Sequence, residues 1–262
     1  MNNNLSIAVP TFNSSKYLKQ CLDSITKINS VNEVVINDDY SNESEFHKIK
    51  VVVDEMEARN KKINFILNRN DRNLGSFFNK VENVKLCKNN YVYQIDSDNF
   101  ITKKSSKTID NIMQDPDDKY LYTPSKILLF ESRHFLSKFN FKKNIKYSNQ
   151  DTVLTIGDIK ESIHLKKNIY GMKSIRWVLN TGNWIFNKDK YIASIDNIHP
   201  DHISKSGDAL IFAYYWYKSG NEIYLKKNLN HYHRLHRASN FSNHGGNSTD
   251  KINEYVSKFL KL

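Results

Sequence analysis

Two aspartates with one residue between them, Asp96 and Asp98, are the side chains in this sequence best suited to chemistry. They come directly after residues 91–95, an apolar run that we expect to form a buried strand. Carboxylate oxygens are the ligands that hard divalent cations prefer, and a cation held there can bind two phosphate oxygens of a nucleoside diphosphate. The pair therefore predicts a Mn²⁺ or Mg²⁺ site, but acidic turns after strands are common enough that the motif needs support from the rest of the chain.

Polar segments also follow three earlier apolar runs. The polar segments are 10–13, 37–41 and 73–75, and the runs before them are 5–9, 33–36 and 63–67. Helical spacing separates the runs, at 17–25, 46–59 and 76–86. Strands that alternate with helices form a parallel sheet covered on both faces, and such sheets bind ligands beyond the carboxyl ends of their strands. Later in the chain we expect helices at 105–113 and 209–217 and strands at 120–123, 126–130 and 168–172.

Taken in order, these segments resemble the motifs of the inverting family 2 glycosyltransferases of the GT-A fold. The matching residues are LSIAVPTFN from 5, EVVINDDYS from 33, NLG from 73 and DSD from 96. The resemblance implies a single α/β domain with a mostly parallel, Rossmann-like sheet flanked by helices and a C-terminal acceptor-side segment. We expect residues 1–100 to form the nucleotide-sugar-binding half, residues 101–240 the acceptor-side half, and residues 241–262 a mobile loop and an amphipathic helix.

The resemblance also implies an activity, the transfer of a sugar with inversion from a nucleotide sugar to a hydroxyl of a glycan or glycoconjugate. The donor-site residues carried over by position are Pro10, Thr11, Asn13, Asp39, Asn73, Gly75, Lys80, Asp96 and Ser97. The first strand end would line the base and ribose, and Asp39 would accept from uracil N3–H, which favours a UDP-sugar. Asn73 and Gly75 would lie beside the nucleoside, since glycine permits close backbone approach. Asp98 would be the principal metal ligand, and Asp96 would contact the ribose or a metal-bound water.

Three positions depart from the family pattern. Tyr40 stands where many relatives have glycine, Lys80 where many have arginine, and Gly207 where many have glutamate. Lys80 keeps a positive charge without the bidentate fork of arginine, so it is either a diphosphate ligand or a solvated lysine on a helix. A nucleotide-sugar-binding module without transfer activity is therefore the main alternative to an enzyme. A nucleotidyltransferase is disfavoured, because no glycine-rich basic loop follows the first strand.

The acceptor half offers a general base. The inverting reaction needs a carboxylate to take the proton of the acceptor hydroxyl, and Asp208 lies at a helix start where relatives carry an acidic pair. Asp208 can instead cap that helix, in which case Asp201 or Asp158 is the base. Trp184, in the segment 181–188, is either a ring that stacks on a sugar or a core residue.

Residues 232–239 resemble a family segment in which an aromatic residue precedes Arg-x-His-x-x-Ser. His236 is the predicted third metal ligand. The alternative metal ligands are His231 and His233. Arg234 and Arg237 add positive charge that can close over the diphosphate and neutralise the leaving group. Residues 240–250, rich in Asn, Ser and Gly, are expected to form a lid.

The composition of the chain limits which classes of ligand and which cellular location we expect. The chain has 262 residues and a formal net charge of +11, which favours anionic ligands. Nucleic acid is not expected, because no RNA- or DNA-binding motif accompanies the charge. Cys21 and Cys87 lack metal-ligand or disulfide spacing. With no apolar run near the roughly 20 residues that cross a bilayer and no room for a signal peptide, we expect a cytoplasmic protein. The basic amphipathic segment 252–262 is either a docked helix or a peripheral contact with the membrane face.

Overall fold

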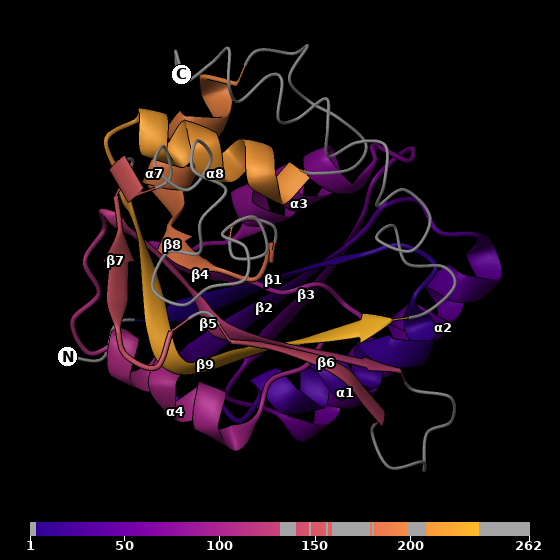
Figure 1. Ribbon diagram of the computed structural model, residues 1–262. Helices are drawn as coiled ribbons and strands as arrows, with labels where there is room; N and C mark the ends of the chain where they lie inside the picture. The colour runs from indigo at the N-terminus through magenta and orange to yellow at the C-terminus, as the bar shows by residue number, and fades with distance from the viewer. Residues whose placement is uncertain are drawn as a thin grey trace.

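The computed structural model describes residues 4–131, 140–146, 148–155, 157–158, 179, 181–198 and 208–235 (Figure 1). Within these residues, nine strands form one sheet. The strands are β1 (Leu5–Thr11), β2 (Val31–Asp38), β3 (Asn64–Arg69), β4 (Tyr91–Gln94), β5 (Tyr120–Glu131), β6 (Asn140–Lys146), β7 (Thr152–Leu154), β8 (Ile185–Asn187) and β9 (Glu222–Leu235). The helices are α1 (Ser15–Ile25), α2 (Glu43–Arg59), α3 (Ser76–Leu86), α4 (Lys103–Ile112), α7 (Lys188–Asp196) and α8 (Asp208–Lys218).

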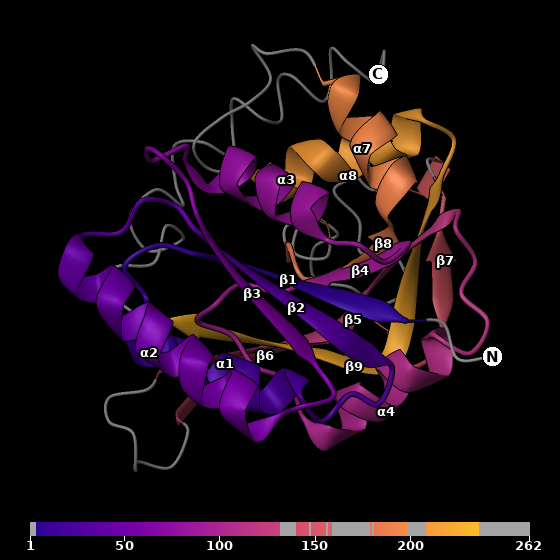
Figure 2. The same cartoon turned by 180° about the vertical axis from the view of Figure 1, so that it is seen from behind.

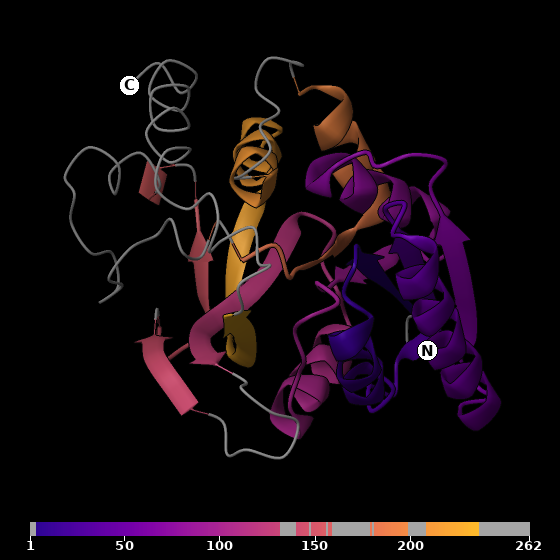
Figure 3. The same cartoon turned by 90° about the vertical axis from the view of Figure 1, so that its right-hand side faces the viewer.

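The sheet has the order β3-β2-β1-β4-β8-β5-β9-β7, and β6 pairs with β5. Strands β1 to β4 are parallel to one another. Strand β8 is antiparallel to both β4 and β5, and β9 is parallel to β5, so β5 and β9 run in the same direction as β1 to β4. The carboxyl ends of these six strands therefore lie at one edge of the sheet. This edge is on the right in Figure 1, where the arrowhead of β9 points, and it faces the viewer in Figure 3.

Helices cover both faces of the sheet. Helices α3, α7 and α8 lie on one face, and α1, α2 and α4 lie on the other (Figures 1 and 2). Side chains alternate along the strands to fill the two cores, because successive residues of a strand point to opposite faces. Ala8 and Val35 join the core under α3 and α8, whereas Ile7, Val9 and Ile36 join the core under α1 and α2.

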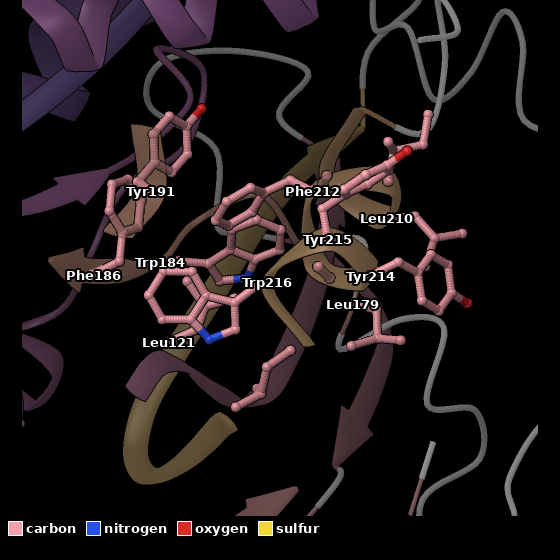
Figure 4. Close-up of a cluster of buried hydrophobic side chains, with 14 of the residues drawn as sticks. Leu121, Leu179, Trp184, Phe186, Tyr191, Leu210, Phe212, Tyr214, Tyr215 and Trp216 are labelled. Carbon is pink, nitrogen blue, oxygen red and sulfur yellow. The ribbon is translucent and has the colours of Figure 1, made fainter. Parts of the chain in front are cut away.

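Helix α8 is buried on every side, with all residues from Ala209 to Tyr217 in the core. Its Phe212 ring packs 5.2 Å from the ring of Trp184, and Figure 4 shows Trp216 beside them. Trp184 is itself buried, and its Nε1–H donates to Thr181 Oγ1 over 2.7 Å. The structure therefore places Trp184 in the core rather than at an open sugar site.

The predicted alternation of strands and helices is confirmed through β4, and the helix predicted at 76–86 matches α3. The strands expected at 120–123 and 126–130 are one strand, β5. Its pairing with β9 shifts between Pro124 and Lys126, whose partners Lys226 and Asn230 are four positions apart. The strand expected at 168–172 lies outside the described residues. No helix in the described ranges is long and apolar enough to cross a bilayer.

Candidate active site

A chain of three hydroxyl groups ties the ends of β1 and β4 together. Thr11 Oγ1 lies 2.8 Å from Ser14 Oγ, which lies 2.7 Å from Ser97 Oγ. Ser14 is the N-cap residue of α1, but its hydroxyl makes no capping bond and is engaged in this chain instead. Pro10 pairs with Asn37 inside the sheet. Two predicted donor-site residues, Thr11 and Ser97, are thus connected through Ser14.

The loops that follow β1 and β2 are joined through Asn13. Its N–H donates to Ser41 Oγ over 2.8 Å, and its side-chain oxygen accepts from the Asn42 amide over 3.3 Å. Asn13 has φ 47° and Tyr40 has φ 64°. This left-handed conformation is common for Asn but unfavourable for an aromatic residue. It accounts for the glycine that is usual in the family pattern at the place of Tyr40.

Asp39 holds the loop that leads into α3. Its Oδ1 accepts from the Leu74 N–H over 2.8 Å, and its Oδ2 accepts from the Gly75 N–H over 2.9 Å. Its backbone carbonyl accepts from the Asn73 side chain over 3.1 Å. The three predicted residues Asp39, Asn73 and Gly75 are therefore brought together. A contact between Asp39 and a uracil base stays a prediction.

A partly buried network of asparagine side chains supports Asp39, and no motif in the sequence indicated it. Asn68 donates to Asn37 Oδ1 over 2.6 Å, and Asn37 donates to Asn79 Oδ1 over 2.8 Å. Asn70 donates to both Asn79 Oδ1 and Asp39 Oδ1, over 3.2 and 2.9 Å. The available signal was the recurrence of asparagine at two neighbouring strand ends and one turn into α3. Because buried amides need partners, the network fixes β2, β3 and α3 relative to one another.

Lys80 reaches the first aspartate of the predicted metal motif. Its Nζ lies 3.4 Å from Asp96 Oδ1. Gly182, with φ 66°, leaves room for this amine, because a Cβ at that position would stand 3.3 Å from Lys80 Nζ. The structure thus favours a role for Lys80 at the site over the alternative of a solvated helix lysine.

Asn183 links the aspartate turn to β9, a connection that the sequence analysis did not foresee. Its Oδ1 accepts from the Asp96 N–H over 3.2 Å, which orients the amide and leaves Nδ2 as the donor to His231 Nδ1 over 2.5 Å. The imidazole proton is therefore on Nε2. Burial, followed by the charges of His233 and Lys80, lowers the pKa of His231 well below 6.5. His231 is therefore uncharged at neutral pH, and its Nδ1 accepts from Asn183.

Arg234 supports the same turn from β9. Its Nε donates to the Asp98 carbonyl over 2.9 Å, and Nη2 donates to Gln20 Oε1 over 2.5 Å. The guanidinium carbon lies 4.5 Å from the Tyr17 ring centroid and 4.8 Å from that of Phe130. Arg234 is only 2% exposed, and burial lowers its pKa. Within the described residues its charged group contacts the Asp98 carbonyl and Gln20. A contact of Arg234 with a diphosphate stays a prediction.

Several predicted residues are not placed. His236, Arg237, Asp201 and the segments 240–250 and 252–262 lie outside the described residues. Asp208 begins α8, but its side chain is not described. Asp158 Oδ2 accepts from both the N–H and the hydroxyl of Thr155, over 2.8 and 3.0 Å. The part of the chain that is described holds no group of three or more His, Cys, Asp or Glu side chains arranged for a metal ion.

A comparison of the sequence with models of known protein families shows which family the chain belongs to. The model of glycosyl transferase family 2 matches residues 6–160, more than half of the chain. The chain belongs to glycosyl transferase family 2. The matched region contains residues 6–13 of the first motif, the other three motifs, and the contacts of Asp39 with Leu74 and Gly75 and of Lys80 with Asp96.

Comparison with individual proteins shows how far the likeness extends. An uncharacterized glycosyltransferase of Mycoplasma genitalium is 34% identical over 105 residues, which are 38% of this chain and 34% of that protein. The crystal structure of S. aureus TarS 1–349 is similar with a TM-score of 0.57 at 20% identity, over 88% of this chain and 60% of that one. Its complex with UDP-GlcNAc gives 0.59 at 18% identity, over 91% and 60%. The chain thus spans less than two thirds of these relatives, and the likeness to TarS confirms the GT-A-like fold.

Proposed function

We propose that this family 2 chain is a metal-dependent, inverting glycosyltransferase that moves a sugar from a UDP-sugar to a hydroxyl of a glycan or glycoconjugate. The observation that carries the proposal is the contact of Lys80 with Asp96 in the turn that also presents Asp98. This turn and the Asp39 loop both follow strands whose carboxyl ends share one sheet edge. The TarS structures support the choice of donor, because that protein has been crystallised with UDP-GlcNAc and with UDP.

Asp39 is the residue that we propose recognises the base by a hydrogen bond. Its Oδ2 accepts one hydrogen bond inside the protein, from Gly75, and a carboxylate oxygen can accept two. The second acceptor position suits the N3–H of uracil. Thr11 and Asn13, at the end of the neighbouring strand β1, are proposed to line the base and ribose.

Asp96 and Asp98 supply the oxygen ligands that suit Mn²⁺ or Mg²⁺. Lys80 already stands beside Asp96, so we assign Asp98 as the principal ligand. His236, two residues beyond Arg234, is the proposed third ligand. When bound, the cation neutralises charge on the departing nucleoside diphosphate. Lys80 adds a second positive charge beside Asp96.

Asp208 is the proposed general base, with Asp201 and Asp158 as rivals. It would take the proton of the acceptor hydroxyl as the acceptor oxygen bonds to the anomeric carbon. The bond between that carbon and the diphosphate oxygen breaks in the same step, which inverts the configuration. The internal hydrogen bonds of Asp158 to Thr155 favour a structural role for that carboxylate.

The first test is ligand binding followed by turnover. A ligand that binds only the native state raises the melting temperature, so UDP, UDP-sugars and other nucleotides should be compared with and without Mn²⁺. Asp98→Asn should abolish the metal-dependent shift and turnover. Asp54→Asn, on the exposed face of α2, is the matched control and should leave both unchanged. A fully active Asp98→Asn variant would refute the metal assignment.

A second pair of variants separates donor binding from transfer. Asp208→Asn should bind the UDP-sugar normally but transfer no sugar, and Asp189→Asn, in the first turn of α7, is its control. Equal loss of binding and transfer would show that Asp208 is structural. A native chain that binds the donor without hydrolysing or transferring it would be a binding module. Release of pyrophosphate from a nucleoside triphosphate would indicate a nucleotidyltransferase.

A further inference from the structure

Tyr40 combines three properties that are rarely found in one aromatic residue. It has a left-handed backbone, with φ 64°. It is 51% exposed. It also lies directly after Asp39, at the carboxyl end of β2. An aromatic side chain at such a backbone position raises the free energy of the folded state, whereas glycine adopts the same conformation without strain.

Hydrogen bonds on both sides of Tyr40 impose this conformation. The Asp39 N–H donates to the Thr11 carbonyl over 2.9 Å, which continues the pairing of β1 with β2. The Ser41 N–H donates to Asp38 Oδ2 over 3.0 Å, and the Ser41 hydroxyl donates to Asp38 Oδ1 over 2.5 Å. The chain must therefore turn sharply at residue 40 whichever side chain stands there.

The Tyr40 ring is supported by a fixed cation. The guanidinium carbon of Arg69 lies 5.1 Å from the ring centroid. Arg69 is itself held, because its Nη2 donates to the Ser41 carbonyl over 2.6 Å and lies 2.8 Å from Glu43 Oε1. The same guanidinium stands 4.4 Å from the Phe46 ring centroid. A cation over an aromatic face restrains the ring, so Tyr40 presents its exposed surface in a defined orientation.

We propose that Tyr40 is the platform on which the nucleobase of the donor stacks. The proposal rests on the nucleotide-sugar donor assigned above. Asp39 would contact the edge of the base while its neighbour Tyr40 contacts a face. Phe12, which follows β1 and is 49% exposed, provides a second aromatic surface at the adjacent strand end. Stacking gives affinity to any base, since every base has a π-face, so Tyr40 contributes affinity and Asp39 contributes selectivity.

The test compares a nucleotide with a ligand that lacks the base. Binding of UDP and of ribose 5-diphosphate is measured by calorimetry for the native chain, Tyr40→Asn, Tyr40→Gly and Tyr40→Phe. Asn removes the ring but tolerates the left-handed backbone, Gly removes it with the least strain, and Phe keeps it. Leu86→Ala, at the far end of α3, is the control for a truncated exposed apolar side chain.

Both variants without the ring should bind UDP about 5- to 150-fold more weakly, the range expected for one base stack. They should bind ribose 5-diphosphate as the native chain does, and Tyr40→Phe and Leu86→Ala should bind both ligands normally. Unchanged UDP affinity in Tyr40→Asn would overturn the proposal, and so would an equal loss for both ligands, because the loop itself would then be damaged. A native chain that binds no nucleotide would instead refute the donor assignment, and the stacking role with it.

Discussion

Replacing Arg234 by methionine removes a buried cation while keeping an unbranched side chain. Two hydrogen bonds from the charged group are lost, to the Asp98 carbonyl and to Gln20, each worth about 1.5–3 kcal/mol. The two ring contacts add about 0.5–1 kcal/mol each. The lowered pKa of Arg234 shows that burial disfavours its charged form, so part of this sum is recovered when the charge is removed. We expect a net loss of about 3 kcal/mol in the free energy of unfolding.

The loss is measured by thermal unfolding. For a chain of this size about 3 kcal/mol corresponds to a decrease of about 6–12 °C in melting temperature. Arg59→Met is the matched control, because the ion pairs of Arg59 with Glu55 and with Asp23 of α1 are exposed, and such pairs contribute about 0–1 kcal/mol. Below the melting temperature, Arg234→Met should also need more Mn²⁺ for half-maximal nucleotide binding, because the Asp98 backbone is less restrained. The reasoning is refuted if Arg234→Met has the same melting temperature as Arg59→Met, or if it binds Mn²⁺ and nucleotide as the native chain does.

Three further predictions concern other parts of the site. Gly182→Ala places a side chain on a left-handed backbone, with its Cβ 3.3 Å from Lys80 Nζ. It should lower the free energy of unfolding by about 1–2 kcal/mol and weaken diphosphate binding. Denaturant titration and calorimetry measure these two quantities, and native values for both would contradict the prediction. Asp39→Asn replaces an acceptor oxygen with a donor amide opposite a backbone N–H. It should lower the free energy of unfolding by about 1–3 kcal/mol and abolish the UDP-dependent shift in melting temperature. A shift as large as that of the native chain would show that another residue recognises the base. Cys21 and Cys87 are buried free thiols, and burial raises the pKa of Cys87 to about 12. A thiol reagent at pH 8 should therefore label neither cysteine until the chain unfolds. Rapid labelling of the native protein would show that the core opens.

The first half of the fold was predictable because its signals are local. Each strand from β1 to β4 contains a short cluster of apolar residues, and each helix between them repeats apolar residues within one or two turns. Strand β9 was missed because Lys226, Lys227 and Asn228 interrupt its apolar residues. Its conformation depends on pairing with β5, which is distant in the sequence. Interactions of this kind leave little trace in any short window.

The candidate site, like the fold, has parts that local sequence signals predict and parts that depend on long-range contacts. The pair of Asp96 and Asp98 was found from residue type and position, and Asp39 was found from the resemblance to the family. Which atoms they contact was not predictable, because the partners of Asp96 come from α3 and from the segment before β8. Asn183 carries no signal of its own, since its function lies in the distance to a histidine 48 positions later. Tyr40 was visible only as a departure from a pattern until its backbone conformation gave the departure a physical meaning.

The long strand β9 also has a consequence for how the molecule is made. A ribosome delivers the motifs of the first hundred residues early, yet Arg234 reaches Gln20 across 214 positions. Until residue 235 leaves the exit tunnel, a nascent chain can pair β1 to β4 but lacks the hydrogen bond from Arg234 to the Asp98 carbonyl. Contacts of such long range form late and slowly. Nucleotide binding during synthesis should therefore begin abruptly once residue 235 has left the exit tunnel, and a fragment that stops before β9 should retain the motifs but lack the Arg234 contact to the Asp98 turn.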